Sequence, residues 1–340
     1  MVQLAGSEAL NFLKSWFICL IRFILLKMCH CGRRPHRICR PQSPGLREVL
    51  LKALTVTADD YGLSLPVNEA VEEGHRRGIL TAASLMVAAP AWEDAVKRAR
   101  RMPSLGVGLH LTLVDGRPVL SPDRVPGLVG PDRRFSNDAA RFGIELFFSP
   151  ELRRQAADEI EAQFARFRET GLRLDHVNGH QHFHMHPVVV DAIARLAPAH
   201  GLPPVRIPVE PFRPSYAAIG DRPLKRLSSW LFYFALTRSM RRKLAAAGLP
   251  LNDQVFGVND SGTMIEGRLL RYLDHLPDGV TEVYCHPATR RWQGIDNLPA
   301  DYQAIEEFAA LTSPVVRAKM EGLRLRPVPF RSAVRAAPLS

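Results

Sequence analysis

Acidic, histidine and asparagine side chains follow several short apolar segments that lie far apart in the chain. Asp59 and Asp60 come directly after the first such segment, and His110 closes a later one. The other members of this polar group are Asp175, His176, Asn178, His180, His182, His184 and His286. In a parallel barrel the carboxyl ends of the strands converge on one face. The sequence therefore predicts that many of these side chains meet in one site.

The adjacent carboxylates of Asp59 and Asp60 indicate metal chemistry. Two acids at the end of an apolar strand are unfavourable unless something uses them, and a divalent cation can bind one while the other remains a base. One Asp and two His complete a three-ligand site that leaves room for water, as in catalytic zinc sites. The structural alternative is that one acid caps the following helix, but Ser64 is the better-placed cap. We therefore favour the functional interpretation.

Four histidines alternate along one stretch of the chain, and they are His180, His182, His184 and His186. Not all of them can be ligands, so we expect one or two to be structural. His186 precedes a proline and is expected to open the next helix.

Short apolar segments alternate with amphipathic helical patterns from residue 51 onwards, which is typical of parallel βαβ units. The seven expected strands are residues 53–57, 83–88, 105–112, 172–177, 205–208, 254–258 and 281–285. The expected helices are residues 65–77, 92–101, 150–170, 187–199, 222–247, 266–275 and 299–311. Seven strands in this alternation suit a (β/α) barrel, complete or incomplete.

The net charge of +11 is concentrated near the N-terminus. Residues 1–52 contain nine Lys or Arg and two Asp or Glu, so they carry +7 and the rest of the chain +4. Because positive and negative charges nearly balance in the rest of the chain, the main support for nucleic-acid binding is removed. Four of the five cysteines also lie in the first 40 residues, which leaves Cys285 alone in the body without a disulfide partner. We therefore expect a cytoplasmic protein.

Residues 1–50 form a basic, apolar extension ahead of an expected domain at 51–330 and a short tail at 331–340. The apolar run at 9–26 is interrupted by Lys14 and Arg22, so it is a poor membrane span, and it lacks a clear signal-peptide cleavage site. The cysteines and histidines at 29–39 match no standard zinc finger. An interfacial anchor, a disordered leader and a start codon placed too early remain open, and we favour the last.

Four segments resemble the YdjC-like carbohydrate deacetylases and occur in the family's order. They are residues 57–64 (Thr-Ala-Asp-Asp-Tyr-Gly-Leu-Ser), 108–112 (Gly-Leu-His-Leu-Thr), 176–185 (His-Val-Asn-Gly-His-Gln-His-Phe-His-Met) and 284–287 (Tyr-Cys-His-Pro). The resemblance extends from about residue 51 to residue 330. Two further segments are similar to the hopanoid-biosynthesis branch called HpnK, namely 78–86 (Gly-Ile-Leu-Thr-Ala-Ala-Ser-Leu-Met) and 258–262 (Val-Asn-Asp-Ser-Gly).

The resemblance implies an α/β fold, a deformed seven-stranded (β/α) barrel of the glycoside hydrolase/deacetylase type, with one divalent metal ion, Mg²⁺ or Zn²⁺. Matched position by position, the metal ligands are Asp60, His110 and His180, and Asp59 is the general base. Tyr61 stands where phenylalanine is usual, which should not affect ligation. The implied reaction removes the N-acetyl group of an amino sugar, carried on a hopanoid glycolipid in this branch.

Other residues are candidates for substrate handling. His286 is the candidate acid for the departing amine, because strand order places it across the barrel from Asp59; alternatively it orients a carboxylate. The candidate substrate-binding residues are Asn178, His182, Trp230 and Asp260. Trp230 belongs to a basic, aromatic helical stretch at 224–244, which either packs on the barrel or lines a lipid entrance at an anionic membrane surface. Peripheral contact with the inner face of the membrane and a homodimer are left open.

Three other functions compete with this interpretation. A chitooligosaccharide-type deacetylase would share the chemistry but not the lipid. A glycosidase could pair Asp59 with Asp175, although the number of imidazoles argues against it. A non-catalytic lipid-binding protein of the same fold would need a decayed site, and all four polar motifs are intact.

Overall fold

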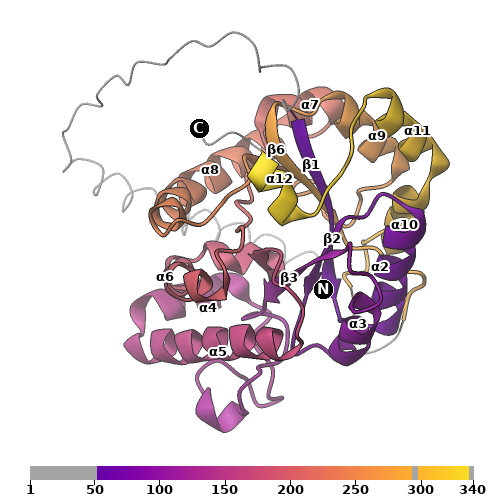
Figure 1. Ribbon diagram of the computed structural model, residues 1–340. Coiled ribbons are helices and arrows are strands. Elements are labelled where there is room, and N and C mark those ends of the chain that lie inside the picture. Colours follow the sequence, from indigo (N-terminus) through magenta and orange to yellow (C-terminus); the bar gives the residue numbers. More distant parts are fainter. Residues whose placement is uncertain (1–51, 293–297, 337–340) are drawn as a thin grey trace, which may run out of the picture. The chain divides into compact units, whose positions relative to one another are not determined.

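In the described part of the chain, a parallel β-sheet is covered by helices (Figure 1). The computed structural model describes residues 52–292 and 298–336. The extension predicted at 1–50 lies outside the described residues. Within them, no helix combines the length and the apolar character needed to cross a membrane.

Six strands make up the sheet in the described part of the chain, in the order β4-β3-β2-β1-β6-β5. Their bounds are β1 (Lys52–Tyr61), β2 (Ala82–Leu85), β3 (Gly106–Leu111), β4 (Val177–Gly179), β5 (Gln254–Phe256) and β6 (Gly279–Cys285). All neighbouring strands are parallel; Thr57 of β1, for example, lies beside Ala82 of β2 and Tyr284 of β6. Both faces of the sheet are buried, which explains the largely apolar strand sequences.

The seventh expected strand, residues 205–208, is not formed. Val205 makes only isolated bridges, to Val177 of β4 and to Leu251 ahead of β5. Three prolines within residues 203–208 have no N–H to donate, so a regular ladder cannot form there. The sheet therefore has six strands, curled into an incomplete barrel, with this segment lying between its two edge strands.

Helices follow most strands and cover the sheet, as the alternation in the sequence predicts. Those of the N-terminal half are α2 (Leu65–Arg77), α3 (Trp92–Ala99), η1 (Pro122–Arg124), α4 (Ala139–Phe148), α5 (Pro150–Glu169), η2 (His180–Met185), α6 (Pro187–Leu196) and η3 (Ala197–His200). Those of the C-terminal half are α7 (Phe212–Ile219), α8 (Pro223–Ala246), α9 (Glu266–Asp274), α10 (Ala304–Thr312), α11 (Pro314–Gly322) and α12 (Phe330–Ala336). Ser64 caps α2 by accepting from the backbone N–H of Val67, which confirms the predicted cap.

The C-terminal helix α12 corrects one predicted boundary. The sequence predicts a tail from residue 331, but α12 packs on the barrel, and Phe330 and Ala333 are fully buried. The Phe330 ring stacks at 5.2 Å on that of His176. The domain therefore extends at least to residue 336.

Candidate metal centre

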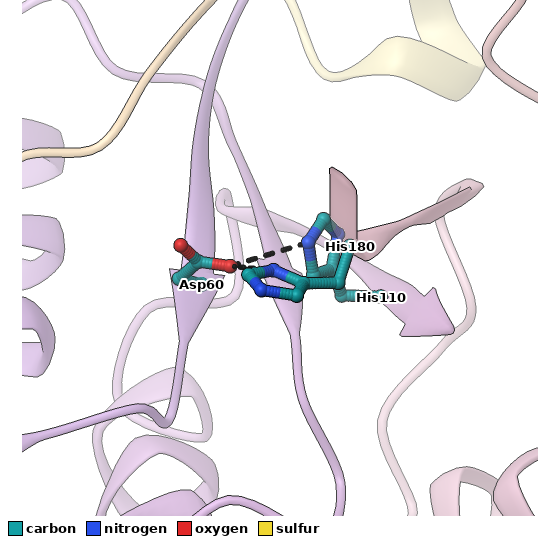
Figure 2. A group of neighbouring side chains, drawn as sticks. All are labelled: Asp60, His110 and His180. Carbon is teal, nitrogen blue, oxygen red and sulfur yellow. Dashed lines mark hydrogen bonds and ion pairs between the residues drawn. The ribbon is translucent and has the colours of Figure 1, made fainter. Parts of the chain in front are cut away.

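The ends of β1 and β3 and the start of η2 bring Asp60, His110 and His180 together (Figure 2). His180 Nδ1 lies 2.9 Å, and His110 Nε2 3.3 Å, from the same carboxylate oxygen, Asp60 Oδ1. One potential ligand atom from each residue lies within 4.8 Å of the other two. Asp60 and His110 are buried, whereas His180 is partly exposed. The three residues predicted as ligands thus form one cluster.

A bulge at the end of β1 explains how two consecutive acids can serve one site. Consecutive strand residues normally point to opposite faces. The register of β1 against β2 shifts between Ala58 and Tyr61, and Asp60 has a φ of 61°. This left-handed conformation is uncommon for residues other than glycine and tends to occur at functional positions. It turns Asp60 towards the histidines while Asp59 contacts the interior of the barrel.

Asn178 fixes the orientation of His110. Its side-chain oxygen lies 2.7 Å from His110 Nδ1, so this ring nitrogen must donate the hydrogen bond. In the neutral imidazole, Nε2 then carries a lone pair and faces the carboxylate oxygen of Asp60. Two such lone pairs repel each other unless the ring is protonated or a cation lies between them. The donor set and its orientation therefore fit a divalent metal ion.

The charges of the cluster shift the pKa values of its members. Burial opposes ionisation of Asp60, but the charge of His180 and the close approach of the two imidazoles outweigh it and hold the Asp60 pKa well below its usual value. Burial likewise lowers the pKa of His180, but the charge of Asp60 and its hydrogen bond produce a net increase.

Asp59 is held in one orientation by donors on both oxygens. Arg206 donates to Oδ2 at 2.5 Å and to Oδ1 at 3.0 Å, and Ser84 and Asn178 donate to Oδ1 at 2.8 and 3.1 Å. Burial would raise the pKa of Asp59, but the neighbouring charges of Arg206 and His110 lower it well below its usual value. Asp59 is therefore an ionised, rigid carboxylate, with Oδ1 4.0 Å from His110 Nδ1.

Arg206 is a site residue that the sequence did not reveal. Its fully buried guanidinium also donates to Glu282 at 2.8 and 2.6 Å and lies 4.6 Å from the ring centre of Tyr284. Because it lies between two carboxylates, neither buried acid is left without a counter-charge. Arg206 comes from the proline-rich segment that replaces the seventh strand, and its only sequence signal is a single cation between Val205 and Ile207.

A family model described as YdjC-like protein matches residues 53–322. This chain belongs to the YdjC-like family. A carbohydrate deacetylase of Geobacillus stearothermophilus is 31% identical over 277 residues, which cover 81% of this chain and 96% of that relative. One of Brevibacillus brevis is 41% identical over 157 residues, which cover 46% of this chain and 59% of that relative.

A similar fold is found in a crystal structure from Enterococcus faecalis V583, titled as that of a putative cellobiose-phosphate cleavage protein. That structure is 23% identical to this chain, with a TM-score of 0.63, and the match covers 84% of this chain and 100% of that one. At this identity the likeness concerns the fold alone. It supports the barrel-like α/β architecture.

A buried hydrogen-bond chain connects Asp59 to Asp175 in this YdjC-like protein. Ser84 Oγ, which donates to Asp59, lies 3.0 Å from His176 Nε2, and His176 Nδ1 lies 3.0 Å from Asp175 Oδ2. Asp175 also packs against Gly106, the first residue of β3, and so lies away from the carboxyl ends of the strands. A serine and a histidine separate the two acids, which therefore cannot flank a glycosidic bond. The alternative of a glycosidase using this pair is wrong.

Two of the four alternating histidines are structural, as predicted. His186 caps α6 by accepting from the N–H of Val188 at 3.3 Å. His184 is buried, and its Nε2 lies 3.0 Å from the carbonyl oxygen of Arg206. Burial lowers the pKa of His184 to about 3 and that of His186 to about 4, so both rings are neutral at physiological pH.

His182 lies in the wall of the site with one ring nitrogen unpaired. Its Nε2 is 3.0 Å from the hydroxyl of Tyr284, and its ring is 6.0 Å, edge-on, from that of Tyr233 in α8. Its buried Nδ1 has no hydrogen-bond partner among the described residues. Burial holds the pKa of His182 well below its usual value. An unpaired buried nitrogen is compatible with substrate contact, so the predicted role of His182 stays a prediction.

His286 follows β6 and also has a buried Nδ1 without a partner in the described part of the chain. Its ring lies 5.6 Å from that of Tyr284 and 5.0 Å from that of Tyr302. Burial lowers the pKa of His286, and the charges of Asp60 and Asp59 partly oppose this effect. The ring is therefore within electrostatic range of both acids, as an acid–base partner of the site must be.

The remaining candidates are placed differently. Asn178 is fully buried, and its oxygen and amide group are used by His110, Asp59 and Ser84, so it orients site residues, and its predicted contact with a substrate stays a prediction. Both oxygens of Asp260 are also used within the protein, and its predicted substrate-binding role stays a prediction. Its partners are Arg222, Arg226, Arg268 and Tyr272.

Trp230 stacks on Phe234 within α8, with the ring centres 5.3 Å apart. The α8 residue that contacts the wall of the site is instead Tyr233, through His182. A role for Trp230 in binding substrate therefore stays a prediction.

Proposed function

We propose that this YdjC-like protein removes the acetyl group from the amine of an N-acetylated sugar, with the help of one divalent metal ion. The observation that carries the proposal is the convergence of Asp60, His110 and His180, with Asn178 turning Nε2 of His110 towards the carboxylate. The names of the curated relatives, carbohydrate deacetylases, support a sugar as the substrate class. Two imidazoles and one carboxylate suit Zn²⁺ better than Mg²⁺.

The bound ion would supply a Lewis acid for the amide carbonyl and would make water more acidic. We propose that Asp59 accepts the proton of the attacking water. The donors around Asp59 keep it ionised and hold it in one orientation, although its low pKa makes it a weak base. His286 would then protonate the departing amine, for which its ring has to carry a proton despite burial. Among the described residues its ring makes no hydrogen bond to a carboxylate, which favours this role over the rival one of orienting a carboxylate.

The test is acetate release from chitooligosaccharides and from an N-acetylglucosaminyl lipid, with and without a chelator. Release that stops on chelation and returns with added Zn²⁺ or Mg²⁺ would support the proposal. Release that is insensitive to the chelator would contradict the metal-dependent mechanism. Tight binding of the lipid without release of acetate would favour a non-catalytic lipid-binding protein.

We propose further that the sugar is carried by a hopanoid-type glycolipid and that α8 contacts the membrane surface. The exposed apolar side chains on α8 are Leu224, Leu227, Leu231 and Phe234. Four basic residues of the same helix, Lys225, Arg238, Arg242 and Lys243, are also exposed, and the helix has no Asp or Glu, which suits an anionic lipid surface. Its inner side reaches the site through Tyr233. A docked α8 would thus hold the site beside the lipid headgroups.

This second proposal is tested with the double variant Leu231→Ser, Phe234→Ser. Both side chains are exposed, so the fold should persist, and Val315→Ser on α11 is a matched control at another exposed apolar position. We expect the double variant to lose about tenfold in activity on the glycolipid in vesicles, because less apolar surface can be buried there. Activity on a soluble chitooligosaccharide should not change. Equal losses on both substrates, or no loss on the lipid, would contradict membrane contact by α8.

A further inference from the structure

The carboxylate of Glu307 in α10 bonds two loops of the site at once. Its Oε1 accepts from the backbone N–H of Met264, and its Oε2 from that of His286, each at 2.6 Å. Met264 lies in the loop after β5, and His286 follows the last residue of β6. The side chain of Glu307 is fully buried. A single carboxylate therefore joins two strand ends to the helix that covers them.

The chemistry of this contact requires an acid. Two N–H donors converge on one side chain, and only a carboxylate offers an acceptor oxygen to each of them, whereas an amide offers one oxygen and a competing donor. Such burial is unfavourable for a charged group, and it raises the pKa of Glu307 to about 7. The two short backbone bonds to the ionised form offset part of this cost.

His286 differs from the other imidazoles of the site in how it is oriented. Asn178 accepts from the ring of His110, and the rings of His180 and His176 lie within hydrogen-bond distance of a carboxylate. His286 has no ring hydrogen bond among the described residues, and its Nδ1 is buried without a partner. Its position therefore depends on its backbone and on ring packing.

Tyr302 supplies that packing and is itself fixed by the loop that precedes Met264. Its hydroxyl lies 2.7 Å from Ser261 Oγ, and its ring lies so close to Gly262 that a Cβ there would be 2.2 Å from a ring carbon. Gly262 has a φ of 72°, which suits glycine. The Ser-Gly part of the 258–262 motif thus supports the ring that lies against His286.

We infer that Glu307 is a positioning residue for His286. Glu307 holds the backbone of His286 at the end of β6, so that the unpaired ring of His286 can reach the substrate. The inference rests on the proposed role of His286 as the acid. On this inference, α10 and the loop after β5 also belong to the site, although they do not contact the substrate.

The test uses Glu307→Gln, with Glu306→Gln as the control. Glu306 is the exposed neighbour on the same helix and loses the same charge. The first measurement is the backbone amide resonance of His286 in ¹⁵N-histidine-labelled, metal-loaded protein. We expect it to shift upfield in Glu307→Gln and to stay in place in Glu306→Gln. This readout needs no substrate and is independent of the reaction.

The second measurement is acetate release, together with metal content and the melting temperature. We expect Glu307→Gln to keep its metal and to lose about tenfold or more in kcat with little change in KM, as a misplaced acid would. Because the glutamine oxygen can still accept from one of the two donors, Glu307→Ala is recorded as well, and an amide resonance unchanged in both variants would overturn the hydrogen bond. A shifted resonance with unchanged kcat would overturn the positioning role. Should the wild type release no acetate at all, the proposed function fails, whereas the amide shift still reports on the bond itself.

Discussion

The two sides of the site are built differently. On the metal side, Asp59, Asp60, His110 and Asn178 are almost fully buried, and each has a side-chain partner of its own. On the other side, His182, His184 and His286 each keep one buried ring nitrogen unpaired among the described residues. Buried polar groups are normally satisfied. The difference suggests that the metal side is complete before substrate arrives, whereas the histidine side is completed by the substrate.

The largest effect should come from removing a predicted ligand on the metal side. Asp60→Ala, His110→Ala and His180→Ala should each lose stoichiometric metal, because a three-ligand site cannot lose one member and keep its geometry. Loss of several kcal/mol of charge stabilisation corresponds to a fall in activity of about 10³-fold or more. Metal content by elemental analysis and acetate release check both points. Metal retained in all three variants would refute the ligand assignment.

Asp59→Asn separates chemistry from binding on the same side. The amide keeps the shape of the carboxylate but cannot accept the proton of water, so we expect activity to fall by about 10²-fold or more with the metal retained. Its bond to the buried Arg206 also weakens, so thermal melting has to be recorded alongside the kinetics. Near-normal turnover would mean that Asp59 serves only to hold Arg206.

Asn178→Ala tests whether the metal side is preorganised by its own hydrogen bonds. Without Asn178, nothing in its place holds Nδ1 of His110, and the ring can turn its Nε2 away from Asp60. Removing such an orienting group typically weakens metal affinity about 10- to 100-fold. Metal titration against a competing chelator measures this. An unchanged affinity would show that packing alone orients His110 and would weaken the contrast between the two sides.

The sequence predicted the metal side of the site better than the histidine side. The residues predicted as ligands and as the base lie at or shortly after the ends of predicted strands, in segments that resemble a family. Arg206 could not be found this way, because its bond to Asp59 joins residues 147 positions apart and leaves no local pattern. The sequence also predicted a seventh strand that does not form, although the prolines at 203–208 indicated its absence.

Glu307 illustrates a different limit of sequence reasoning. Next to Glu306 it resembles an exposed acid on the surface of a helix. Only its spacing from Ala304 and Leu311 places it on the buried face of α10. Nothing in that spacing identifies its partners, since both are backbone groups of distant loops.

The smallest expected effect concerns His182, on the histidine side of the site. His182→Phe keeps a ring between Tyr233 and Tyr284 but removes both nitrogens, including the unpaired Nδ1. One hydrogen bond to the substrate contributes about 0.5–1.5 kcal/mol, so KM should rise about 2- to 10-fold while metal content stays constant. His184→Phe is a poor control because His184 bonds the backbone of Arg206. Tyr284→Phe is better, since it removes the hydroxyl partner of His182 and leaves Nδ1 in place. If Tyr284→Phe raises KM as much as His182→Phe does, the effect comes from a displaced ring rather than from Nδ1, and the histidine side is not completed by the substrate at this position.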